Sequence, residues 1–126
     1  MPHHKINYVE LPAHDLTATK EFFEKTFHWR FEDYGPDYCA FHDAGLDGGF
    51  YRANLKSDPL HGGALVVLYS DTLEETLAQV QANGGYIVQA IFDFPGGRRF
   101  HFTEPSGNEF AVWGEAAESG EFSLKL

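Results

Sequence analysis

The sequence predicts an α+β fold built from two tandem βαβββ modules whose mixed sheets form a concave cavity. The main observation is an internal repeat, because a strand-like segment followed by a helix cap occurs at 7–16 and again at 64–73. Each half also ends with a glycine-containing turn before a strand, at 43–51 and 104–113. A duplicated unit of this kind predicts a cavity between its halves, and cavities are where small molecules usually bind.

The first module is predicted to span residues 5–53. Its first strand is expected at Ile6–Leu11, where apolar and polar positions alternate, and Pro12 is expected to end it. Asp15 is then expected to cap a helix that runs to about His28, because large apolar residues recur after it at helical spacing. Turn-forming residues divide the remainder into three short strand candidates, 30–34, 38–42 and 48–52.

The second module is predicted at 63–115, after a polar linker at 54–62. Asp71 is expected to cap its helix, with Glu74 three residues later as in a capping box, and the glycines after Asn83 are expected to end it. Three further strands are expected at 86–92, 98–103 and 108–113, with a hairpin turn at 95–97. The acidic tail from residue 115 onward is expected to be exposed.

The composition of the chain limits the classes of partner that it is expected to bind. The chain has a formal net charge of −10 and a pI near 4.9, which disfavours binding to nucleic acid or to an anionic membrane surface. The single cysteine, Cys39, cannot form an internal disulfide and is expected to be a small buried apolar residue. No apolar run reaches the length of a membrane span, and the first residues do not form a signal peptide. We therefore expect a cytoplasmic protein whose partner is a small organic molecule.

The segment 98–109 contains the phrase Glu104-Pro105-Ser106-Gly107-Asn108, which resembles the turn before the last strand of the vicinal oxygen chelate superfamily. That superfamily includes glyoxalase I, bleomycin-resistance proteins, fosfomycin-resistance enzymes and extradiol dioxygenases. The resemblance covers about residues 5–115 and implies a single glyoxalase/bleomycin-resistance-like domain over 1–126, which is expected to form a homodimer. It implies no single activity, because this fold carries lyases, dioxygenases, transferases and binding proteins.

The resemblance also implies where a divalent metal would bind. The four ligand positions of the superfamily fall here on Tyr8, Leu65, Ala111 and either Gly48 or Gly49. None of these side chains is a suitable ligand. We therefore expect this chain to be a small member of the superfamily with no metal at the usual site and no other cofactor. The alternative is a displaced metal site made by Glu10, His101 and Glu109.

Side chains two apart on a strand share a face. With the resemblance, this alternation predicts a cavity lined by Tyr8, Glu10, Leu65, Val67, Arg99, His101, Glu109, Ala111 and Trp113. Glu10 and His101 are the candidate catalytic residues, with Glu10 or His101 as the base, and the other seven are candidate ligand-binding residues. In the alternative interpretation, Glu10 or Glu109 forms an ion pair with Arg99 and His101 bonds to backbone. Phe100 and Phe102 are expected to pack under the helices.

Two functions are therefore predicted. The first is a metal-free binding protein, similar to bleomycin-resistance proteins, in which Trp113 and Tyr8 stack on a planar or cationic ligand and a glutamate supplies charge. The second is a glyoxalase-like lyase, isomerase or dioxygenase, with a displaced metal or a glutamate or histidine base. A phosphate site at residues 96–99 is a further possibility, but a hairpin turn with surface arginines is favoured there.

Overall fold

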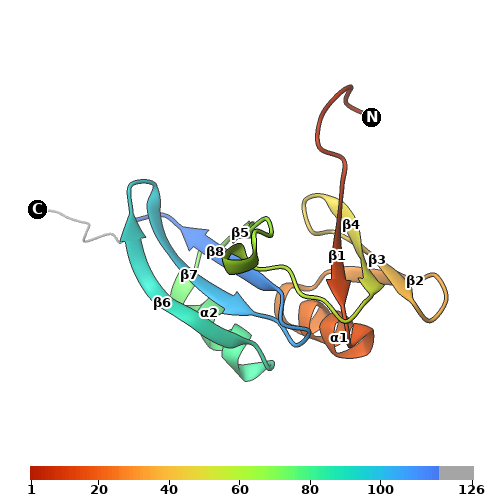
Figure 1. Cartoon of the computed structure of the whole chain (residues 1–126). Helices are drawn as coiled ribbons and strands as arrows, with labels where there is room; N and C mark the ends of the chain where they lie inside the picture. Colours follow the sequence, from red (N-terminus) through yellow and green to blue (C-terminus); the bar gives the residue numbers. More distant parts are fainter. Residues whose placement is uncertain (117–126) are drawn as a thin grey trace, which may run out of the picture.

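The computed structural model describes residues 1–116 and contains two four-stranded mixed sheets, which confirms the predicted fold class (Figure 1). The first sheet has the order β1 (Tyr8–Ala13), β4 (Asp47–Arg52), β3 (Tyr38–His42), β2 (Arg30–Asp33). The second has the order β5 (Val66–Tyr69), β8 (Glu109–Gly114), β7 (Gly97–Thr103), β6 (Tyr86–Phe94). In each module the first and last strands pair in parallel and the other pairs are antiparallel.

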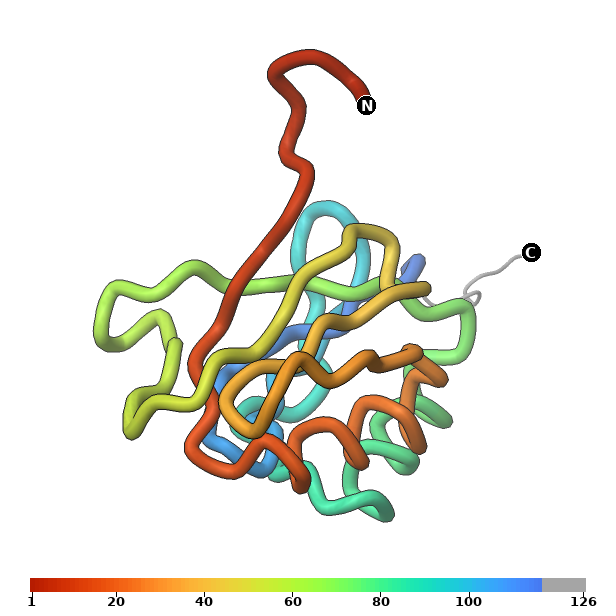
Figure 2. Tube along the Cα trace, turned by 90° about the vertical axis from the view of Figure 1, so that its right-hand side faces the viewer, coloured from red at the N-terminus to blue at the C-terminus, as the bar shows by residue number. Residues whose placement is uncertain are grey.

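Two helices, α1 (Leu16–Phe27) and α2 (Leu73–Ala82), complete the modules. Figures 1 and 2 show both helices on the same side of the molecule, with the strands above them. Thr26 of α1 accepts a hydrogen bond from Asn83, the residue after α2, so the helices also contact each other. Within residues 1–116, neither helix is long and apolar enough to cross a membrane.

The first module follows its predicted elements closely. Asp15 caps α1 by accepting a hydrogen bond from the backbone N–H of Ala18 at 3.0 Å, and His28 ends the helix in the left-handed conformation with φ 61°. The expectation that Pro12 ends the first strand is wrong, because β1 continues to Ala13. β1 is the edge strand of its sheet, and an edge strand tolerates a residue without an N–H donor.

The second module departs from prediction at the start of its helix. Thr72, not Asp71, is the N-cap of α2, and it makes no side-chain capping bond. The hydroxyl of Ser70 instead accepts from the Thr72 N–H at 2.9 Å. The predicted end is correct, since Asn83 follows the last helical residue and Gly84 takes φ 101°. The linker contains a short 3₁₀ helix, Pro59–His61.

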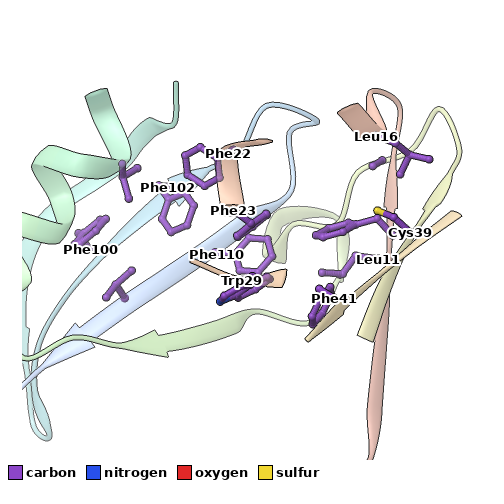
Figure 3. Packing of buried hydrophobic residues seen from close by; sticks show 14 of the residues in the cluster. Leu11, Leu16, Phe22, Phe23, Trp29, Cys39, Phe41, Phe100, Phe102 and Phe110 are labelled. Atoms are coloured by element: carbon purple, nitrogen blue, oxygen red, sulfur yellow. The ribbon is translucent and has the colours of Figure 1, made fainter. Parts of the chain in front are cut away.

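Side chains of helix α1 pack against buried residues of both modules. Phe23 is fully buried, and its ring lies 4.4 Å from Trp29, 5.6 Å from Phe50 of β4 and 5.1 Å from Phe110 of β8, measured between ring centroids. Figure 3 shows Phe23 close to Phe110 and Trp29. The neighbouring Phe22 reaches Phe102 of β7 in the same way. The predicted packing of Phe100 and Phe102 beneath the helices is therefore confirmed. The two modules share one hydrophobic core.

A second link between the modules is the buried carboxylate of Glu104, which is 2% exposed. Its oxygens accept hydrogen bonds from the Thr19 hydroxyl at 2.6 Å, from the Ser106 N–H at 2.9 Å and from the Asn108 side-chain amide at 2.7 Å. The same amide donates to the carbonyl of Pro12 at 2.7 Å. The turn that carries the family resemblance thus connects the second sheet to α1 and β1.

Candidate functional site

The face of the second sheet turned away from the helices collects most of the predicted lining residues. Cross-strand register places Arg99 beside Trp113, and both His101 and Val67 beside Ala111. Glu109 joins this face through a direct contact with His101. The alternate residues on these strands, Phe100, Phe102, Phe110 and Val112, are buried in the core. Strand alternation therefore assigned six residues to one face, as the sequence analysis expected.

His101 and Glu109 form the buried pair of this face. Their side chains are 6% and 14% exposed, and His101 Nδ1 lies 2.9 Å from Glu109 Oε2. A carboxylate only accepts hydrogen bonds, so Nδ1 carries the hydrogen and a neutral ring keeps a lone pair on Nε2. Nε2 is buried and has no hydrogen-bond partner among residues 1–116. In this part of the chain, the structure therefore contains neither the alternative ion pair between Glu109 and Arg99 nor the alternative hydrogen bond between His101 and the backbone.

Arg99 lies against two aromatic side chains of the second sheet. Its guanidinium carbon lies 5.4 Å from the centroid of the Phe92 ring and 5.3 Å from that of Phe94, in cation–π geometry. The adjacent Arg98 is on the opposite face, where it forms an ion pair with Glu74 of α2. The hairpin interpretation of this segment is correct, because Phe94 pairs with Gly97 across a two-residue turn.

A cavity of about 240 Å³ opens beside Arg99, and its lining is Val67, Phe94, Gly96, Arg99 and Trp113. The indole of Trp113 packs edge to face against Tyr69, with centroids 4.9 Å apart. The sequence analysis omitted Phe92 and Phe94 from the site. Phe94 lies beyond the predicted end of its strand, and extending the strand through the hairpin would have found it. The charge offered at this cavity is positive, whereas an acid-bearing pocket was expected.

Tyr8 and Glu10 lie on the first sheet and form a different cluster. The Tyr38 hydroxyl donates to Glu10 Oε2 at 2.9 Å, and its oxygen lies 2.6 Å from the Tyr8 hydroxyl, which must therefore donate to it. The sequence analysis missed Tyr38, which packs over Gly49 of β4. No hydrogen bond or ion pair among residues 1–116 joins this cluster to the second-sheet residues. Leu65 is half-buried just before β5.

Tyr38 is expected to be the last tyrosine to ionise. Burial, followed by hydrogen bonds to Tyr8 and Glu10, raises the pKa of its phenol well above the ordinary value of 10. The folded state therefore favours the neutral phenol, so this stability is present below pH 10 and lost as pH rises through the raised pKa. An ultraviolet titration should show one late tyrosine that disappears in Tyr38→Phe and ionises earlier in Glu10→Gln. An unchanged late step in Tyr38→Phe would contradict this assignment.

The residues at the superfamily's usual metal positions do not fit a metal. Leu65 and Ala111 have no donor atom, and the Tyr8 hydroxyl is used by Tyr38. Across the described part of the chain, 1–116, no group of three or more His, Cys, Asp or Glu side chains is arranged to hold a metal ion. In particular, Glu10 bonds to Tyr38 on the first sheet while His101 and Glu109 pair on the second. That a cofactor is not required stays a prediction.

Comparisons with known proteins agree with this architecture. The model of the Glyoxalase/Bleomycin resistance protein/Dioxygenase superfamily matches residues 5–112. A glyoxalase-related enzyme from Fulvimarina pelagi has a TM-score of 0.74 at 15% identity, covering 89% of this chain and 88% of that one. The fosfomycin resistance protein FosX from Listeria monocytogenes has a TM-score of 0.71 at 16% identity, covering 94% and 98%. TnmS3, an antibiotic binding protein from Streptomyces sp. CB03234, has 0.66 at 19%, covering 92% and 99%. No curated protein matches the chain.

Proposed function

Since the chain belongs to the Glyoxalase/Bleomycin resistance protein/Dioxygenase superfamily, we propose that it binds a small organic molecule on the open face of its second sheet, without the usual divalent metal. The observation that carries this proposal is the cavity in which Val67, Phe94 and Trp113 surround Arg99. Small-molecule sites are typically apolar and aromatic with a few placed polar groups, and this cavity has that composition. Antibiotic binding by TnmS3 supports a binding role, because it places such a role on the same fold.

The energy of binding would come mainly from the aromatic side chains. A flat ligand can stack on the indole of Trp113, which already packs edge to face against Tyr69 and Phe94. Glu109 contributes indirectly, because it holds the ring of His101 rather than facing a ligand as a free charge. Homodimer formation and a cytoplasmic location stay predictions beside this proposal.

A screen of planar organic molecules by tryptophan fluorescence tests the proposal. We expect binders to change the emission of Trp113, and Trp113→Phe to remove that signal and weaken binding about two- to tenfold. The other tryptophan, Trp29, is buried in the core and serves as an internal reference. Tyr34→Phe, an exposed aromatic change on the first module, should leave binding unaltered. Binding that survives Trp113→Phe at full strength, with the signal on Trp29, would contradict the site.

One observation favours a second candidate, a metal-free lyase or isomerase. The Glu109 carboxylate orients the buried imidazole of His101 and leaves Nε2 bare, which is the arrangement of a general base. Glu10 is less suited to that role, because its carboxylate accepts a hydrogen bond from Tyr38. For any substrate identified by the screen, this candidate requires His101→Gln to abolish turnover while the dissociation constant stays nearly constant.

A further inference from the structure

We propose that the ligand of this cavity is a planar molecule carrying an anionic group, such as an aromatic carboxylate, and that Arg99 binds that group. The inference rests on the proposed function and specifies its ligand class. It replaces the expectation of a cationic ligand with that of an anionic one, because the carboxylate of this face, Glu109, already pairs with His101. Glu109 lies 2.9 Å from His101, and the charged side chain among the five residues that line the cavity is the guanidinium of Arg99.

Arg99 differs from every other arginine of the chain in its charge environment. Arg30 pairs with Asp43, Arg52 pairs with Asp37, and Arg98 pairs with Glu74. Arg99 has no carboxylate within 4.0 Å among residues 1–116, although the chain carries a net charge of −10. In so acidic a protein, a part-buried arginine without an acidic partner is a site prepared for an anion from outside the chain.

The donor atoms of Arg99 point to the same conclusion. Its Nε is buried and has no hydrogen-bond acceptor among residues 1–116, and an unsatisfied buried donor is costly. The Nε of Arg98 is also unpartnered, but the terminal nitrogens of that side chain bind Glu74, which neutralises its charge. A carboxylate on the ligand would bind the terminal nitrogens of Arg99 through two parallel hydrogen bonds, which is a geometry that guanidinium groups favour.

The surrounding rings define the rest of the ligand. Phe92 and Phe94 flank the guanidinium, at 5.4 and 5.3 Å, and limit its movement. Trp113 and Val67 complete the apolar wall of the cavity, so a flat apolar ring can lie against them while its acid reaches Arg99. A ligand of this class uses the cation and the aromatic wall together, whereas a cationic ligand would be repelled by the guanidinium.

Three probes that share one ring system test the inference: 2-naphthoate, its methyl ester and 2-naphthylmethylammonium, titrated against the full chain with Trp113 fluorescence as the readout. We expect the carboxylate to bind at least about tenfold more tightly than the ester, since hydrogen bonds to charged groups are the stronger class. Arg99→Gln should remove this preference. Arg98→Gln is the matched control, because Arg98 lies on the opposite face, and it should preserve the preference.

The outcomes separate this inference from the proposed function. If the probes bind but the ester or the ammonium equals the carboxylate, the ligand class is wrong and the binding function stands. If Arg99→Gln retains the preference for the carboxylate, the inferred role of Arg99 is wrong and the binding function stands. If none of the three probes binds, the inferred ligand class is overturned, and the screen of planar molecules alone decides the proposed function. Should Arg99→Gln fail to fold, Arg99→Lys keeps the charge without the planar fork and should lose part of the preference.

Discussion

Glu104→Gln is expected to lower the free energy of unfolding by about 3 kcal/mol or more, although Glu104 lies outside the candidate site. The groups that surround the carboxylate are all donors: the Thr19 hydroxyl, two backbone N–H groups and the Asn108 amide. A glutamine has one acceptor oxygen, and its NH₂ group would face donors in a buried place. The loss should also loosen the second sheet from α1, because this turn connects the two.

Chemical denaturation at neutral pH measures this effect, with Glu21→Gln on the exposed side of α1 as the control. The pH dependence adds a second check. Burial raises the pKa of Glu104 above its ordinary value of 4.5, against the opposing effect of its hydrogen bonds. The cost of burying the charge is therefore absent below pH 4.5 and is incurred as pH rises through the raised pKa, so the wild type loses part of its stability over that range even though the charged form keeps its four donors. Glu104→Gln should lack this component. A variant as stable as the control would refute the assigned role.

Phe23→Ala is expected to cost about 3–5 kcal/mol, the range for truncating a buried phenylalanine. Its ring packs against Trp29, Phe50 and Phe110, so the cavity left behind would lie between both modules. Thermal or denaturant unfolding should show one cooperative transition shifted for the whole chain. Leu60→Ala, an exposed apolar truncation in the linker, should stay within about 0.5 kcal/mol of the wild type. Two separate transitions in the wild type would show that the modules do not share a core.

Local patterns predicted most of the fold because each element carries its own signals. The cap at Asp15, the glycine after Asn83 and the hairpin before Gly97 all lie where turn and capping chemistry place them. Two of the errors have different causes, one in the sheet order and one in a local hydrogen bond. β1 continues through Pro12 because it is an edge strand, and the sequence of a single strand does not reveal its position in the sheet. Ser70 replaced Asp71 as the group that satisfies the start of α2.

The sequence was sufficient to predict which side chains share a face of the second sheet, but not which of them contact one another. Alternation assigned Arg99, His101 and Trp113 to one side, and register confirmed that they are neighbours. Which carboxylate meets which base depends on side-chain conformations and on sheet curvature. The register of β6 shifts between Ile87 and Phe92, after which Phe92 pairs with Arg99, and no pattern in the sequence marks these shifts. The pocket is positively charged because Glu109 pairs with His101 while the guanidinium of Arg99 lies against the aromatic rings.

The central claim is that the small-molecule site lies on the second sheet. Larger cavities are rivals, and the two of greatest volume among them are one of about 520 Å³ between the modules, near Trp29 and Leu46, and one of about 580 Å³ at the linker, near Leu55 and His61. Two-dimensional ¹H–¹⁵N spectra of the labelled chain, recorded during titration with 2-naphthoate, separate the three. The account predicts that the largest shifts fall on the Trp113 indole and on the backbone amides of Phe94, Gly96 and Arg99, which line this cavity and neither rival. Shifts centred on Leu46 or on Leu55 and His61, with Trp113 unmoved, would contradict it.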